Sequence, residues 1–150
     1  MKVVIQRVKS ASVSVKGKMI SEIGHGLFVL LGIGLYDKNE DADWLIKKVC
    51  QLRIFEDENG VMNHSLIDVN GEALVVSQFT LHAKTKKGNR PSYIKAAKPE
   101  TAVPLYEYFI RKLELATGKT VKTGKFGKMM DIHQNNYGPV TIVIDTKNKE

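Results

Sequence analysis

The chain has little of several features that often decide function. It holds one cysteine in 150 residues and no long apolar run. Cys50 cannot form an intrachain disulfide, so we expect a small buried side chain in a reducing compartment. The longest apolar stretch, residues 27–33, is far below the roughly 18 residues that suggest a membrane span. Residues 1–15 alternate like a strand rather than resembling a signal peptide. These absences predict a cytoplasmic protein that does not associate with a membrane.

Familiar catalytic signatures are missing as well. The chain has no Gly-x-Ser-x-Gly elbow, no His-Glu-x-x-His pair, no phosphate-binding glycine loop and no cysteine and histidine spacing suited to zinc. Four scattered histidines are more typical of structural or solvated positions, and only His82 follows a polar cluster closely enough to merit a test. We therefore predict no metal and no cofactor.

The hydrophobic content and the charge are what the chain does supply. With 43% hydrophobic residues it can bury one core, and we expect a single domain over residues 1–150 with a frayed tail at about 146–150. A formal net charge of +7 favours a polyanionic partner, with nucleic acid the first candidate. The cations cluster in residues 84–98 and 119–128. Lys86, Lys87 and Arg90 are predicted phosphate contacts, although a solvated basic loop would give the same pattern.

The apolar pattern predicts a sheet covered by two helices. Alternating or continuous apolar residues predict strands over about 1–8, 12–15, 19–23, 26–33, 74–81, 120–123, 130–134 and 140–144. Helical spacing predicts one helix over about 39–52 and a second from about Pro99 to a stop at Gly118. Strands interrupted by only two helices imply an α/β domain in which helices cover a sheet.

Polar residues end one of the buried strands. Leu74-Val75-Val76 leads directly into Ser77-Gln78-Phe79-Thr80, so these groups are presented from rigid backbone. Thr80 could act as a nucleophile, for which His82 is the only nearby base. Alternatively, the backbone N–H groups of Gln78 and Phe79 could stabilise the oxyanion that forms when water attacks an ester carbonyl.

A second segment, Tyr137-Gly138-Pro139-Val140-Thr141, introduces the last apolar strand. In this order, and with Arg7 between Ile5 and Val8, the two segments resemble the D-aminoacyl-tRNA deacylase family. The similarity runs from residue 1 to about 145 and includes Leu52-Arg53-Ile54-Phe55, Gly88-Asn89-Arg90-Pro91-Ser92 and Thr123-Gly124-Lys125-Phe126-Gly127. Met129 and Tyr137 depart from the family's commonest pattern, which has Asp at both positions.

The resemblance implies a fold, a reaction and a set of site residues. The expected fold is a three-layer β/β/α domain with two main helices packed on sheet, and the expected reaction is hydrolysis of the ester of D-aminoacyl-tRNA. The matching catalytic residues are Ser77, Gln78, Phe79 and Thr80. Because that ester is already activated and the ribose carries a neighbouring hydroxyl, we favour the oxyanion hole over a nucleophilic threonine. Phe126, Gly127 and Met130 match the pocket for the terminal adenosine of the tRNA acceptor end.

The resemblance also implies how handedness is read. The Gly138–Pro139 bond is expected to be cis, to be held by Arg7 and to project into the active site of a second subunit, so that a homodimer forms composite sites. A wall of main-chain atoms rejects L-residues by exclusion. Glycine has nothing to exclude, so Gly-tRNA, such as glycine mischarged on tRNA-Ala, should also be cleaved.

The sequence thus predicts an esterase that frees D-amino acids from tRNA and so proofreads chirality in translation. Two rivals stay open. The first is a non-catalytic RNA-binding module, favoured by the charge but lacking interleaved aromatic residues for base stacking. The second is a small-molecule esterase or amidase whose basic loops serve only solubility.

Overall fold

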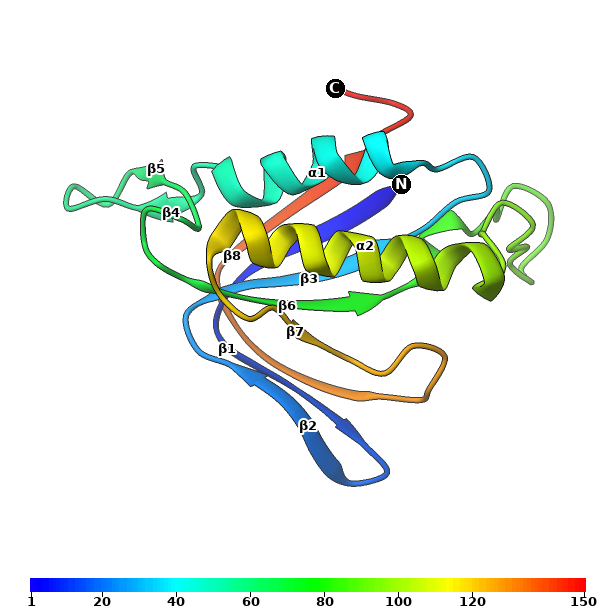
Figure 1. Ribbon diagram of the computed structural model, residues 1–150, viewed down its shortest axis with the longest axis horizontal. Helices are drawn as coiled ribbons and strands as arrows, with labels where there is room; N and C mark the ends of the chain where they lie inside the picture. Colours follow the sequence, from blue (N-terminus) through cyan, green and yellow to red (C-terminus); the bar gives the residue numbers. More distant parts are fainter.

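The computed structural model describes residues Met1–Glu150 as a curved sheet with two helices lying side by side over one face (Figure 1). The sheet has six strands in the order β2-β1-β3-β6-β7, and β8 pairs with β1 on its other side. A small separate sheet joins β4 and β5. The strands are β1 (Lys2–Val15), β2 (Lys18–Ile23), β3 (Gly26–Gly32), β4 (Phe55–Glu56), β5 (Met62–His64), β6 (Glu72–Ser77), β7 (Lys122–Thr123) and β8 (Asp131–Asp145).

The first strand organises the sheet because it is long enough to pair with three others. Its first half, residues 2–8, pairs antiparallel with β3, and its second half, residues 11–15, pairs with β2. Lys16 and Gly17 close the β1–β2 hairpin with φ of 50° and 77°, the left-handed backbone that tight hairpin turns require. The predicted hairpin is therefore confirmed.

Parallel pairing of β3 with β6 forms the centre of the sheet. Both strands are almost fully buried, which explains why their sequences are continuous apolar runs instead of alternating patterns. The two backbones approach so closely that a Cβ on Gly26 would lie 1.9 Å from the carbonyl oxygen of Glu72. Glycine at position 26 is thus required by the packing of these strands.

Two helices cover the outer face of this centre. Helix α1 (Asn39–Gln51) and helix α2 (Pro99–Thr117) match the predicted bounds closely, and α2 ends at Gly118 with φ of 68°. Pro104 lies in the second turn of α2 and is followed by Leu105 and Tyr106, which belong to the buried apolar face of the helix. Neither helix is long and apolar enough to cross a bilayer.

Two apolar clusters make the layers of the domain. The larger lies between the helices and the sheet and includes Leu45, Val75 and Phe109; the smaller includes Val13, Phe28 and Val76 and is enclosed where β1, β2 and β8 curl beneath β3 and β6 (Figure 1). The expected α/β fold with two main helices packed on sheet is confirmed. Cys50 is buried in the larger cluster, where burial raises the pKa of its thiol to about 11, so it is a structural residue.

Four boundaries differ from those predicted. The strands expected over about 1–8 and 12–15 are one strand, β1. The strand expected through Leu81 ends at Ser77, and residues 79–82 form the short 3-10 helix η1 (Phe79–His82). The two strands expected near 130–134 and 140–144 are one strand, β8, whose pairing with β1 shifts register twice between Gln6 and Ser10. Only residues 122–123 of the strand predicted over 120–123 pair with β6. The sequence pattern predicts two strands here because the middle of β8 is exposed and polar, although its backbone stays extended.

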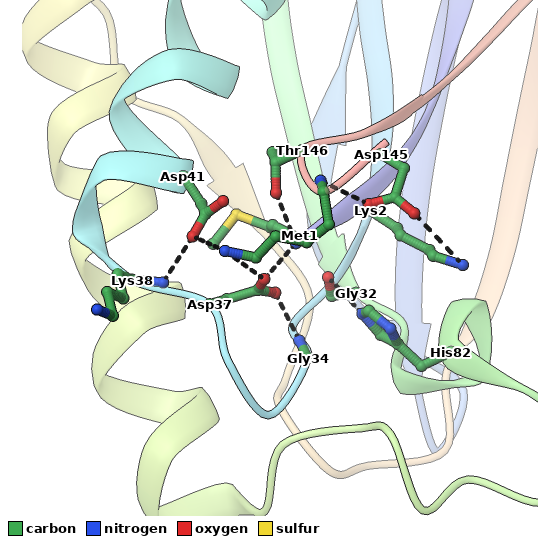
Figure 2. Close-up of polar contacts among 11 residues, drawn as sticks. Met1, Lys2, Gly32, Gly34, Asp37, Lys38, Asp41, His82, Asp145 and Thr146 are labelled. Atoms are coloured by element: carbon green, nitrogen blue, oxygen red, sulfur yellow. Dashed lines mark hydrogen bonds and ion pairs between the residues drawn. The ribbon is translucent and has the colours of Figure 1, made fainter. Parts of the chain in front are cut away.

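Both ends of the chain meet in a buried polar cluster (Figure 2). The Met1 ammonium contacts a carboxylate oxygen of Asp37 and donates to Thr146 Oγ1 at 2.8 Å, while the Gly34 amide donates to Asp37 at 2.6 Å. Lys147 pairs with Asp41 at 2.7 Å. Thr146 and Lys147, expected to begin a frayed tail, are instead fixed against α1 and β1.

Candidate active site

A cavity of about 450 Å³ opens where β6 ends, and it brings the polar end of that strand together with the residues predicted to bind the terminal adenosine. Ser77, Gln78 and Phe79 line it from one side and Phe126, Gly127 and Met130 from another. Sequence reasoning missed the apolar remainder of the wall, because these residues look like ordinary core positions: Leu31, Ile33, Val76, Ala97, Ala102 and Ile132. Lys128 and Met129 complete the lining, and Met129 is 90% exposed at the rim.

The turn after β6 leaves one backbone amide of a cavity-lining residue without a partner. The Gln78 N–H donates to the Leu31 carbonyl oxygen at 2.8 Å, which extends the β3–β6 pairing by one residue and fixes the turn. Phe79 begins η1, and its N–H has no acceptor within the chain. First amides of helices are generally left open in this way and are available to a ligand. Of the two amides expected to bind an oxyanion, only that of Phe79 is free.

Side chains around the turn leave Thr80 without a base. Gln78 Nε2 donates to Thr80 Oγ1, so the hydroxyl oxygen is already engaged. The His82 ring is buried, and its Nε2 lies 3.1 Å from the Gly32 carbonyl oxygen on β3 (Figure 2). Thr80 does not line the cavity. This geometry does not provide the adjacent base that a nucleophilic threonine needs.

The opposite wall of the cavity is held by a buried tyrosine. Tyr106 of α2 packs edge-on against Phe126 with ring centroids 5.8 Å apart, and its hydroxyl donates to the Val75 carbonyl oxygen at 2.8 Å. Burial raises the pKa of Tyr106, so the hydroxyl keeps its proton and the hydrogen bond is maintained. A Cβ on Gly124 would lie 2.5 Å from Met130 Sδ, so glycine there lets the methionine pack inward.

The Gly138–Pro139 dipeptide lies elsewhere, on the exposed middle of β8. Its peptide bond is cis, and neither residue lines the cavity of its own chain. Arg7 is 3% exposed and donates from Nε to the Tyr137 carbonyl oxygen at 2.9 Å and from Nη1 to the Ile54 carbonyl oxygen at 2.8 Å. Arg7 therefore contacts the residue directly before the dipeptide, and its role in holding Gly138–Pro139 for a second subunit stays a prediction from the family resemblance.

Tyr137 itself is held between two cations. The Arg7 guanidinium lies 4.8 Å from the centre of its ring and the Lys9 ammonium lies 4.6 Å from it. Such contacts each contribute about 0.5–1 kcal/mol at exposed sites. Tyr137 is therefore attracted to Arg7 by a cation–π contact as well as through its backbone carbonyl oxygen.

The predicted phosphate contacts Lys86, Lys87 and Arg90 lie in an exposed loop beyond η1. Backbone hydrogen bonds in both directions between Lys84 and Ser92 close the base of this loop, at 2.8 and 3.0 Å. None of the three cations forms an ion pair, and none lines the cavity. No group of three or more histidine, cysteine, aspartate or glutamate side chains converges as a ligand set anywhere in the chain.

Comparison with known proteins identifies the family of the chain. Residues 4–145 match the model of the family described as D-Tyr-tRNA(Tyr) deacylase. The chain belongs to this deacylase family. A D-aminoacyl-tRNA deacylase of Bacteroides fragilis is 61% identical over 150 residues, which is 100% of both chains. One of Flavobacterium psychrophilum is 59% identical over the same full length.

Solved structures give the same result for the deacylase fold. The chain superposes on a c-Myc DNA unwinding element binding protein with a TM-score of 0.91 and 43% identity, covering 97% of this chain and 98% of that one. A probable eukaryotic D-amino acid tRNA deacylase superposes with a TM-score of 0.81 at 17% identity, covering 95% and 97%, and supports the fold alone. The family resemblance read from the sequence is confirmed, and the chain is a hydrolase of this deacylase family.

Proposed function

We propose that this deacylase hydrolyses the ester bond between a D-amino acid and tRNA, releasing the free amino acid and the tRNA. One observation carries the proposal: Phe79, whose backbone N–H has no acceptor within the chain, lines the same cavity as Phe126 and Met130. An ester whose terminal adenosine occupies the apolar side of this cavity would present its carbonyl to that amide.

Backbone electrostatics supply the chemistry in this proposal. Water attacks the ester carbonyl carbon, the developing oxyanion accepts a hydrogen bond from the Phe79 N–H, and the ester C–O bond breaks as the ribose oxygen takes up a proton. One preorganised donor of this kind is worth about 3–4 kcal/mol, or roughly 10²–10³ in kcat. The Gln78 amide contributes by holding the turn through Leu31, and Thr80 by holding the Gln78 side chain.

Selection of handedness requires the second segment. The exposed Gly138–Pro139 dipeptide does not reach its own cavity, so we propose that it enters the cavity of a second copy and that the active unit is a homodimer. Main-chain atoms beside the substrate α-carbon leave room for hydrogen and exclude a side chain. L-residues are then rejected, whereas D-residues and glycine are admitted, so Gly-tRNA is a further substrate. Charged tRNA is used in the cytoplasm, where we expect the protein to act.

Release of amino acid from D-Tyr-tRNA, L-Tyr-tRNA and Gly-tRNA tests reaction, substrate and handedness together. We expect hydrolysis of the first and third and little of the second. Equal hydrolysis of both tyrosyl enantiomers would contradict the exclusion model, and inactive Gly-tRNA alone would contradict its account of glycine. Free D-tyrosine esters separate this enzyme from a small-molecule esterase, and binding of tRNA with no release of amino acid would favour an RNA-binding module.

A matched pair of variants tests the Phe79 amide. Phe79→Pro removes the N–H, and residue 79 is the first residue of η1, a position where proline is tolerated because that N–H makes no bond within the helix. We expect kcat to fall about 10²–10³-fold. Phe79→Leu keeps the amide and loses the ring, so it should retain most of kcat. Similar kcat values in the two variants would exclude the amide as the oxyanion donor.

A further inference from the structure

An aromatic pair extends from the rim of the cavity to the protein surface. Phe79 is 55% exposed and lines the cavity, and Tyr93, which is 38% exposed, packs edge-on against it with ring centroids 5.0 Å apart and an interplanar angle of 77°. The Tyr93 hydroxyl makes no hydrogen bond within the chain. In an edge-to-face pair, the ring that offers its edge has neither of its faces covered by the other ring.

The charge around this pair is of one sign. No Asp or Glu occurs between Glu72 and Glu100, a segment that contains both rings and the cations Lys84, Lys86, Lys87, Arg90, Lys95 and Lys98. None of these six cations is in an ion pair. The Lys84–Ser92 hydrogen bonds bring one of them beside Tyr93 in space. An open ring face among unpaired cations fits a flat group that carries phosphate.

From this geometry we infer that Phe79 and Tyr93 form a stacking platform for an unpaired base of the tRNA 3′ strand, next to the terminal adenosine. The inference rests on the proposed function, because the terminal nucleotide must occupy the cavity for its neighbour to reach the rim. Stacking on aromatic side chains tolerates any base, while nearby cations contact the backbone phosphates. The expectation from sequence that aromatic residues for stacking are lacking is thus revised, since residues 14 positions apart meet at one surface.

A truncated substrate distinguishes the contribution of this platform from that of the catalytic cavity. The probes are D-Tyr-tRNA and D-tyrosyl adenosine, the same ester without the preceding nucleotides. Because loss of one stacked base typically costs about five- to 150-fold in affinity, we expect Tyr93→Ala to lower kcat/KM on D-Tyr-tRNA by that factor, chiefly through KM. On D-tyrosyl adenosine the variant should stay within about twofold of the wild type. Tyr93→Phe should match the wild type on both.

Tyr36→Ala provides the control, because Tyr36 is 81% exposed and lies outside this segment, between β3 and α1. Unchanged kcat/KM on D-Tyr-tRNA in Tyr93→Ala would overturn the platform, as would equal losses on both substrates. If the wild-type protein hydrolyses neither substrate, the proposed function fails separately. Binding of uncharged tRNA then decides, and equal affinity of wild type and Tyr93→Ala would overturn the platform as well.

Discussion

Arg7 Nε donates a hydrogen bond to the backbone carbonyl oxygen of Tyr137 at 2.9 Å, directly before the exposed Gly138–Pro139 dipeptide. Arg7→Ala leaves this carbonyl and that of Ile54 without their donor, and each such loss costs about 1–3 kcal/mol when the group is buried. We expect the dipeptide to lose its fixed position and the D-to-L ratio of Tyr-tRNA hydrolysis to fall at least about tenfold.

Arg53→Ala is the matched control, because this exposed arginine hydrogen-bonds Asn63 and makes no hydrogen bond with residues 137–139. It should leave the ratio unchanged. Rates are compared only for variants that melt cooperatively. An Arg7→Ala protein that is folded and retains full discrimination would show that the arginine does not set handedness.

Thr80→Ala tests whether the hydroxyl acts chemically. With Thr80 Oγ1 occupied by Gln78 Nε2 and His82 Nε2 occupied by Gly32, we expect kcat on D-Tyr-tRNA to fall less than about tenfold, through a looser turn. A nucleophile would instead lose about 10⁴-fold or more. Single-turnover rates make the measurement, and an inactive but folded variant that still binds tRNA would favour the nucleophile mechanism.

Gly32→Ala should impair the turn from the side of β3. A Cβ at this position would lie 2.8 Å from the Gln78 carbonyl oxygen and 3.0 Å from Leu81 Cβ, so the backbone that carries the Phe79 amide must move. We expect kcat to fall at least about tenfold, because misplaced donors lose most of their effect.

Gly24→Ala serves as the comparison, since its Cβ would meet only a flexible carboxylate oxygen of Glu72 at 3.4 Å. This variant should keep wild-type kcat. Equal activity of the two alanine variants would mean that the turn tolerates displacement.

Asp41 should make the free energy of unfolding depend on pH in the acidic range. Burial opposes its ionisation, but hydrogen bonds from Lys147 and the Lys38 amide outweigh that effect and lower the pKa of its carboxyl to about 2 from 3.8. A pKa lowered by folding stabilises the native state above the unfolded value, and this contribution disappears as the pH falls from about 4 to 2. The pair is near the surface, so we expect only about 1 kcal/mol.

Urea denaturation at about pH 6 and about pH 2.5 measures this contribution. The loss of unfolding free energy on acidification should be smaller by about 1 kcal/mol in Asp41→Asn than in the wild type. An identical loss in both proteins would show that the Asp41 carboxyl does not take part.

Local pattern was enough to predict both helices, the β1–β2 hairpin and the polar end of β6. Each of these depends on residues close together in sequence: the apolar stripe of α1, the Lys16-Gly17 turn, the apolar residues before Ser77. The continuity of β8 was not predictable in this way, since backbone pairing with β1 holds residues whose side chains face solvent.

The site residues differ in the same way, since some could be predicted from the sequence and others depend on the fold. Grouping of Phe79 with Phe126 and Met130 followed from family resemblance, whereas Leu31, Ala97 and Ala102 line the cavity only because distant elements converge there. That the Gln78 amide is already bonded to Leu31 depends on how β3 and β6 are aligned, which no spacing within residues 77–80 encodes.

Strand β8 carries Ile132 of the cavity wall near its start and the Gly138–Pro139 dipeptide in its middle. Directly after its end lies Thr146, which accepts a hydrogen bond from the Met1 ammonium. Side chains on a strand alternate between faces, so inserting or deleting a single residue would turn everything beyond it to the opposite side. The cavity wall, the Gly138–Pro139 dipeptide and the contact with Thr146 therefore have fixed spacings along one strand, so a substitution at any of them is tolerated more easily than an insertion or deletion between them.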